Sequence, residues 1–176
     1  ETGAPAGGEF QVNTYTTNVQ WVPGVDSDGA GNFVVVWNSL GQDGAAWGVF
    51  GQRFDAEGTR VGREFQVNSY TTNYQTTGSA VAIDDSGNFV VAWNSYPGQD
   101  GSSSGVFAQQ FAFRGGPVEG EFQVNTYTTS GQLRPSVAAS PSGDAPIDSA
   151  TAPVKPPVPS PARIDRVFEN WSDEIR

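Results

Sequence analysis

The sequence Gly-Asn-Phe-Val-Val-Val-Trp-Asn-Ser at residues 31–39 returns as Gly-Asn-Phe-Val-Val-Ala-Trp-Asn-Ser at residues 87–95. Valine and aromatic residues of this kind fill β-strands, and the flanking Gly and Asn residues favour turns. Because the run is apolar at successive positions, we expect both faces of this strand to be covered by other parts of the protein. A repeated, doubly covered strand therefore decides the fold class.

The repetition extends well beyond this strand. The phrase Glu-Phe-Gln-Val-Asn begins at Glu9, Glu64 and Glu121, so that one unit spans about 56 residues. A Gly-Gln-Asp-Gly loop and a Gly-Val-Phe-x-Gln-x-Phe run also recur, the latter at 48–54 and 105–111. We assign a β-repeat domain to 9–140, with repeats at 9–63 and 64–120 and a partial third repeat at 121–140.

Runs of strand-forming residues between turn residues predict four strands in each unit. In the second copy these strands are expected at 80–83, 88–95, 105–111 and 121–128, and Gly, Asp, Ser and Pro fill the connections. The predicted fold is all-β, an up-and-down antiparallel meander repeated along the chain. The phrase that contains Phe10 and Val12 alternates apolar and polar residues, which is typical of an outer strand.

These motifs carry a resemblance. Phe-Gln-Val-Asn-Thr, Gly-Asn-Phe-Val-Val-x-Trp-x-Ser, Gln-Asp-Gly and Gly-Val-Phe-x-Gln-x-Phe, in this order, resemble the propeller-type tandem β-repeats of large bacterial secreted and cell-surface proteins. The resemblance covers roughly residues 8 to 140. It implies β-propeller-like blades and an adhesive or structural role outside the cell, and it implies no chemistry.

The number of units departs from that pattern, because closed propellers have about four to eight blades and this chain supplies little more than two. A lone pair of blades would expose two large apolar faces. We therefore expect a fragment of a longer array, an oligomer that completes a ring, or a small β stack of another kind.

The two ends of the chain differ from the repeats. Residues 1–8 predict a flexible N-terminus, and the third repeat stops where its Phe-Val-Val strand should begin, which suggests truncation of the unit. Proline at high density predicts a linker at 141–162, either an inert spacer or a ligand for a proline-binding groove. Apolar residues at helical spacing predict a short amphipathic helix at 163–176, docked on the β body, frayed, or bound to a partner.

Composition excludes several functional classes. The 176 residues carry a formal net charge of −10 and include no His, Cys or Met. The excess of carboxylates disfavours nucleic acid and anionic membranes, so cations and neutral glycans are better ligands. Disulfides, Cys nucleophiles, Ser-His-Asp triads and the usual zinc sites are excluded. The lack of Met predicts a processed product or a fragment, and the composition agrees with a secreted or cell-surface protein.

Acidic loops are the candidate metal sites, because oxygen side chains at alternate positions among glycines suit calcium. The same residues cap tight hairpin turns with their own side chains, so a turn role and a calcium role remain open. The convergence of both loops of one unit would favour the cation. The candidate ligands are Asp26, Asp28, Asn32, Asp43, Asp84, Asp85 and Asp100.

Tryptophan offers a second kind of site. Trp37 and Trp93 end the most apolar strand of each copy, and this position favours a packing role over sugar stacking. Trp21 and Trp47 have no counterpart in the second copy, which makes them the candidate exposed ligand-binding aromatics.

No catalytic constellation is present. A carboxylate pair of glycosidase type is formally available, but the Glu residues lie beside turns, and the recurring ones suit solubility or edge protection. We predict a non-enzymatic structural or adhesive repeat module of an extracellular bacterial protein whose partners are neighbouring repeats or further copies of the chain. The alternatives are a carbohydrate-binding module that uses exposed Trp residues and a calcium-stabilised oligomerising scaffold.

Overall fold

A computed structural model describes residues 7–78, 80–140 and 164–170 of the chain, the last range as backbone only. These residues form strands and connecting turns with no helix among them, which confirms the predicted all-β class. The predicted proline-rich linker at 141–162 and residues 1–6 of the predicted flexible N-terminus lie outside the described residues.

The strands follow one another along the chain as β1 (Gln20–Ser27), β2 (Phe33–Leu40), β3 (Trp47–Phe54), β4 (Arg60–Gln66), β5 (Tyr74–Thr76), β6 (Val81–Ile83), β7 (Phe89–Tyr96), β8 (Gly105–Phe111), β9 (Pro117–Gln123), β10 (Leu133–Ala139) and β11 (Ile164–Asn170). Strands β1 to β9 form one mixed nine-stranded sheet that does not close on itself. Strands β10 and β11 form a separate antiparallel pair.

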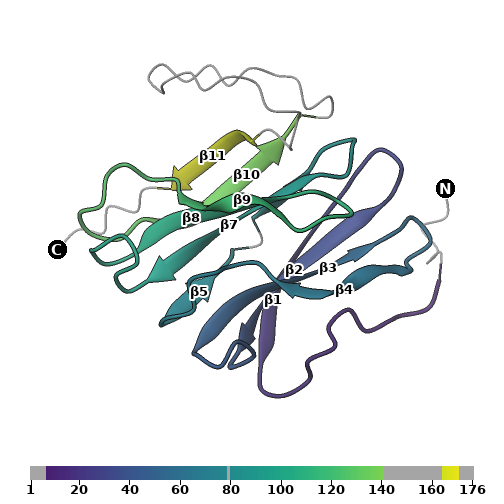
Figure 1. Ribbon diagram of the computed structural model, residues 1–176, viewed down its shortest axis with the longest axis horizontal. Helices are drawn as coiled ribbons and strands as arrows, with labels where there is room; N and C mark the ends of the chain where they lie inside the picture. The colour runs from purple at the N-terminus through teal and green to yellow at the C-terminus, as the bar shows by residue number, and fades with distance from the viewer. Residues whose placement is uncertain (1–6, 79, 141–163, 171–176) are drawn as a thin grey trace.

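The nine-stranded sheet consists of two antiparallel meanders (Figure 1). In the first meander, β1, β2, β3 and β4 pair in chain order. In the second meander, β7 pairs with the two short strands β5 and β6 and with β8, which pairs with β9. One parallel pair, Trp47 with Tyr74, connects the two meanders into a single sheet.

Strand β2 has a covered surface on each side, as its unbroken apolar sequence predicts. Val34 and Val36 belong to the cluster between the two meanders, whereas Val35 and Trp37 belong to a cluster on the opposite face of the first meander. These four side chains alternate between the faces because successive residues of a strand point to opposite sides.

The second meander lies between the first meander and the β10–β11 pair (Figure 1). One of its faces, which includes Trp93, Phe107 and Phe111, packs with Val34, Val36 and Val49 of the first meander. Its other face presents small residues such as Ala82 and Ala92, and Val137 and Ala139 of β10 pack against them. We call the first surface the aromatic face of the second meander and the three valines the valine face of the first.

Glycine at the start of β3 and of β8 permits a close approach of the preceding loop. A Cβ atom on Gly48 would lie 2.7 Å from the Asp43 carboxylate, and one on Gly105 would lie 2.8 Å from that of Asp100. Both distances are shorter than real Cβ contacts, so a larger residue at either position would require the aspartate side chain to shift. This explains why the Gly-Val-Phe motif recurs together with the loop.

Three predicted elements differ in the structure. The outer strand expected in the phrase of Phe10 and Val12 does not form, because residues 8–16 pair with none of the described strands. The strand expected at 121–128 is β9, which begins at Pro117 and ends at Gln123, because the Asn125 side chain accepts the Val106 amide (2.8 Å) where a ladder carbonyl would otherwise be needed. The helix expected at 163–176 is wrong for Ile164–Asn170, which form β11. The edge of β10 offers backbone partners there, whereas a helix of this length is marginal alone. Residues 163 and 171–176 lie outside the described residues.

Candidate functional site

The two equivalent aspartates that begin the β1–β2 and β6–β7 connections hold their own turns. Asp28 Oδ1 accepts the backbone N–H groups of Ala30 and Asn32, each at 2.9 Å, and its Oδ2 accepts the Asn32 side chain at 2.8 Å. Asp84 Oδ1 likewise accepts two backbone N–H groups at 2.9 Å, and its Oδ2 accepts the Asn88 side chain. These oxygens act as turn caps, which is the role that short polar side chains play at such connections.

The other predicted metal ligands have separate positions. Asp26 Oδ2 accepts the Ile83 backbone N–H at 2.9 Å and so connects the first meander to the second. Asp43 and Asp100 each accept a backbone N–H two residues further along their loop. Asp85 lies beside the Asp28 turn, because a Cβ atom on Gly29 would be 3.1 Å from Asp85 Oδ1.

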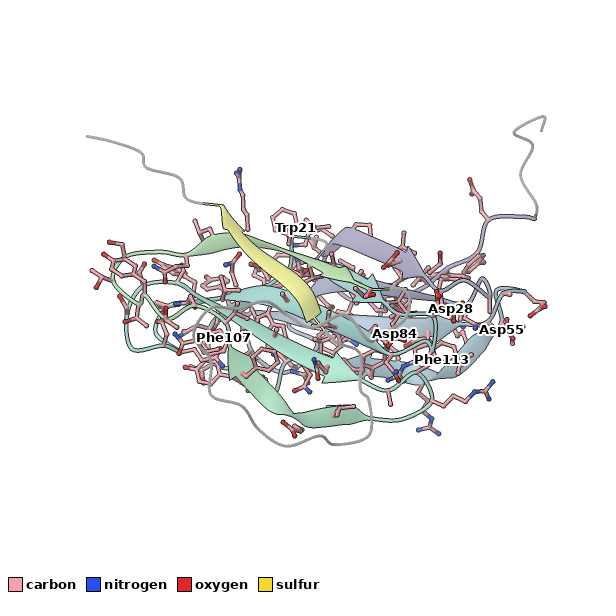
Figure 2. All side chains as sticks on the ribbon, turned by 90° about the horizontal axis from the view of Figure 1, so that it is seen from above. Trp21, Asp28, Asp55, Asp84, Phe107 and Phe113 are labelled. Atoms are coloured by element: carbon pink, nitrogen blue, oxygen red, sulfur yellow. The ribbon has the colours of Figure 1, made fainter. Side chains whose placement is uncertain are left out.

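The two acidic loops of the first meander do not meet. The loop that contains Asp28 precedes β2 and the loop that contains Asp43 follows it, so they lie at opposite ends of that strand. Asp28, Asp55 and Asp84 lie toward one end of the molecule (Figure 2). Even so, within 7–78 and 80–140 no group of three or more acidic side chains is arranged to hold a metal ion. The geometry therefore favours the turn role.

The two candidate ligand-binding tryptophans come together in the structure. Trp21 of β1 stacks on Trp47 of β3, with ring centroids 5.1 Å apart and planes 28° apart. Half of the Trp21 surface is exposed. Tyr74 and Tyr96, which pair across β5 and β7 next to Trp47, are also exposed. An exposed aromatic row thus crosses the connection between the two meanders.

An apolar hollow of about 260 Å³ lies on the face of the first meander that points away from the second. Its lining comes from the N-terminal segment, β1 and β2: Val12, Asn13, Gln20, Trp21, Pro23, Val35 and Trp37. On the second meander the corresponding aromatic face is filled by the valine face of its neighbour, and Trp93 is fully buried. The hollow is therefore found on a face of the first meander that none of the other described strands covers in this way.

The Glu residues that open the repeated phrases connect one phrase to the next. Glu64 Oε2 accepts the Thr14 backbone N–H at 2.5 Å and its hydroxyl at 2.9 Å. Glu121 Oε2 accepts the backbone N–H of Ser69 at 2.6 Å, and Ser69 occupies the phrase position of Thr14. A Gln from the Gly-Gln-Asp-Gly loop, Gln42 or Gln99, donates to the other oxygen of each carboxylate. This bridging role is more specific than the surface charge expected from the sequence.

The recurring Asn and Gln residues form a second network that sequence reasoning missed. Asn68 Oδ1 accepts the Val49 backbone N–H at 2.8 Å, and Asn125 does the same for Val106. Gln20, Gln75 and Gln132 each donate to a Thr carbonyl three residues earlier. The available signal was the constant seven-residue separation of Asn and Gln, because side chains that replace backbone partners cannot be exchanged freely.

Arg53 is a buried cation between the meanders. Its guanidinium lies over the rings of Phe65 (4.3 Å) and Phe89 (5.3 Å), and its Nη2 donates to the Gly115 carbonyl at 2.8 Å. Loss of water on burial lowers the pKa of Arg53 below its ordinary value, although a guanidinium stays charged at neutral pH. The stacked rings and the carbonyl stabilise the charge, so Arg53 joins β3 to the β8–β9 connection.

A polar hollow of about 460 Å³ lies beside the first Glu bridge, lined by Thr14, Gln42, Gln52, Arg60, Gly62, Arg63 and Glu64. Arg60 donates from Nη2 to the Gln11 carbonyl at 2.7 Å, which fastens the N-terminal segment to β4. Glu64 and Gln42 are engaged in the bridge described above. These residues hold the chain together, and they form no pair of carboxylates suited to acid–base chemistry.

No protein-family model matches the chain, and neither a curated protein nor a solved structure matches it. In the part of the chain that the structure describes, no helix is long and apolar enough to cross a membrane.

Proposed function

We propose that this chain is a non-enzymatic structural and adhesive module of a secreted or cell-surface bacterial protein. Its units are propeller-blade-like meanders that bury one another's faces. One observation carries the proposal: the valine face of the first meander fills the aromatic face of the second, and all the residues named on the two sides except Val36, which is Ala92 in the second copy, recur in the sequence. A sequence whose repeated residues serve mainly to pack one unit on the next is typical of an array that builds a surface.

Two further features support this proposal. The Glu bridges use the side chains that an enzyme of glycosidase type would need, and they use them to connect phrases. The excess of carboxylates and the lack of Cys suit a protein that works outside the cell and does not bind nucleic acid.

A bead assay tests the adhesive role. Beads that carry the chain through a terminal tag are passed under flow over bacterial cells, and their retention is compared with that of albumin-coated beads. We expect several-fold greater retention for the chain. Equal retention of both kinds of bead on the bacterial cells would contradict an adhesive module.

The stack of the exposed Trp21 on the partly buried Trp47 favours a second candidate, a carbohydrate-binding module. Flat aromatic rings that are exposed on one side bind the apolar faces of sugar rings, and the hollow beside Trp21 extends this surface. We expect neutral oligosaccharides to bind on a glycan array and the Trp21→Ala variant to lose this binding. Tyr127→Ala, which removes an equally exposed aromatic, is the control. Unchanged binding by Trp21→Ala would contradict this candidate.

A further inference from the structure

We propose that copies of this chain bind head to tail, with β1 of one copy against β10 of the next. The inference rests on the proposed function, because it names the partner of the stacked units. Its template is a contact inside the chain, in which Val137 and Ala139 of β10 pack on a cluster of small side chains that includes Ala80 and, within β6, Ala82. A valine of β10 thus lies on small side chains in and beside β6, the strand that occupies the same place one repeat earlier.

The two kinds of surface that make this contact are also exposed, one at each end of the stack of units. Val25 of β1 occupies the repeat position of Val81 and Val137, and 65% of its surface is exposed, whereas Val81 is 8% exposed. At the other end, Ser136 and Ala138 occupy the positions of Ala80 and Ala82, and both are exposed. The face of β1 therefore fits the outer face of β10 in the way that β10 fits β6.

The first phrase, which begins at Glu9, packs on the first meander in the same way that the second phrase, which begins at Glu64, packs on the second meander. Phe65 of the second phrase packs on Phe111 with ring centroids 5.3 Å apart, and Phe10 of the first phrase packs on the equivalent Phe54 at 5.5 Å. Val12 joins the apolar cluster of the first meander in the same manner that Val67 joins that of the second. The first phrase thus covers one edge of the face of the first meander that contains Phe54, and it leaves the hollow on that face open.

The Glu bridges show the same complementarity. Glu64 bonds to Thr14 and Glu121 to Ser69, so each bridge connects a phrase to the one before it. Glu9 begins the first phrase and Thr126 occupies the Thr14 position in the third; both are exposed. A second copy placed head to tail brings these two residue types together again. Because the two contact surfaces differ, the interface is heterologous and repeats until a ring closes or a filament grows.

Light scattering after size exclusion, over a range of concentrations, tests the proposal on the whole chain. We expect a mass of at least two chains, and a mass of one chain for Val25→Asp and for Ala138→Arg, which place a charge at opposite ends of the molecule. Ala45→Asp adds the same negative charge as Val25→Asp to an exposed hairpin loop and should leave the mass unchanged. Circular dichroism should show the same fold for all four proteins, because the three altered side chains are exposed.

Mixing the two end variants separates head-to-tail binding from other modes. Val25→Asp keeps a normal β10 end and Ala138→Arg keeps a normal β1 end, so a one-to-one mixture should form a dimer and stop there. A monomeric parent chain, an oligomer that survives Val25→Asp, or a mixture that stays monomeric would overturn the proposal. A monomer that still retains beads under flow would overturn the assembly alone, whereas loss of bead retention by an intact oligomer would overturn the adhesive role alone.

Discussion

Strands β1 and β6, which occupy the same place in the two meanders, have related sequences and different environments. Val25 of β1 is 65% exposed, whereas Val81, at the same repeat position in β6, is 8% exposed. Strand β6 lies between β1 on one side and β10 on the other, whereas among the described strands β1 contacts an equivalent strand, β6, on one side only. The difference shows that burial at a repeat position comes from the adjacent unit and not from the residue itself.

The same contrast is found between the aromatic face of the second meander and the equivalent face of the first meander. Trp93 is fully buried beneath the valine face, while Trp37 lies at the edge of an apolar hollow of about 260 Å³. In a stack of similar units, an end unit loses the stabilisation that an inner unit receives from its neighbour. The predictions below compare equivalent residues at these two places.

Replacing the two central tryptophans should produce the largest effect and the clearest difference. Trp93→Ala removes a fully buried side chain from the cluster between the meanders and should cost about 3–5 kcal/mol of unfolding free energy. Trp37→Ala should cost less, because the hollow beside it already reduces its packing. Urea unfolding followed by circular dichroism gives both values. Equal losses would show that the two faces are equivalent after all.

The Asn residues of the phrases allow a sharper comparison. Asn68→Ala leaves the buried Val49 N–H without its 2.8 Å acceptor and should cost about 1–3 kcal/mol. Asn13 donates to the Tyr15 carbonyl as Asn68 does to the Tyr70 carbonyl, but its side-chain oxygen accepts the Gln11 side chain and no backbone N–H of a strand. Asn13→Ala should therefore cost less. Hydrogen exchange should show faster exchange of the Val49 amide in Asn68→Ala, with Val106 unchanged. Unaltered exchange at Val49 would refute this role.

The Glu bridge should have a smaller effect. Glu64→Ala breaks the bonds from the Thr14 backbone and hydroxyl and should cost about 1 kcal/mol, because the carboxylate is only half-buried. Glu9→Ala changes the same phrase position at a site that is exposed within one copy, and it should be nearly neutral at concentrations where the chain is a monomer. Thermal unfolding in low and high salt provides the measurement, and a shift in melting temperature for Glu9→Ala as large as that for Glu64→Ala would contradict the bridge.

Calcium should have the smallest effect. The Asp28 and Asp84 oxygens are occupied by backbone and side-chain N–H groups of their own turns, so a cation would have to displace these bonds. We expect scanning calorimetry to give the same melting temperature in calcium, in magnesium and in chelator. A rise specific to calcium would revive the scaffold hypothesis and assign the acidic turns as its sites.

Much of the fold was predictable because it depends on local patterns. The Phe-Val-Val-x-Trp strand and the Gly-Val-Phe strand lie within one residue of their expected positions at β7 and β8, where a continuous apolar run ends at turn residues. The fourth strand was displaced because Asn125 replaces a backbone partner, and this depends on the distant Val106 amide. The C-terminal helix was wrong at Ile164–Asn170 because pairing with β10 is a long-range contact.

The candidate site was predictable only in part. The lack of counterparts for Trp21 and Trp47 in the second copy singled them out, and they do stack on each other. The acidic residues were identified by type, but the same Asp and Gly residues serve a turn or a cation, and only the position of the neighbouring N–H groups distinguishes the two. Arg53 carried no sequence signal, because its second-copy counterpart is Gln110 and its partners come from three separate strands and loops.

The sequence by itself determined the all-β class, the repeated strand and the turns, because alternation, β-branched residues and turn-forming Gly, Asp and Asn act over a few neighbouring residues. Only the tertiary structure decided which copy of each residue is buried, which carboxylates are engaged, and which surface is left without a partner. The physical reason is that repeated residues are alike in sequence while their neighbours in space are not. A valine at one end of the stack faces solvent, and the equivalent valine one unit further on lies in the core.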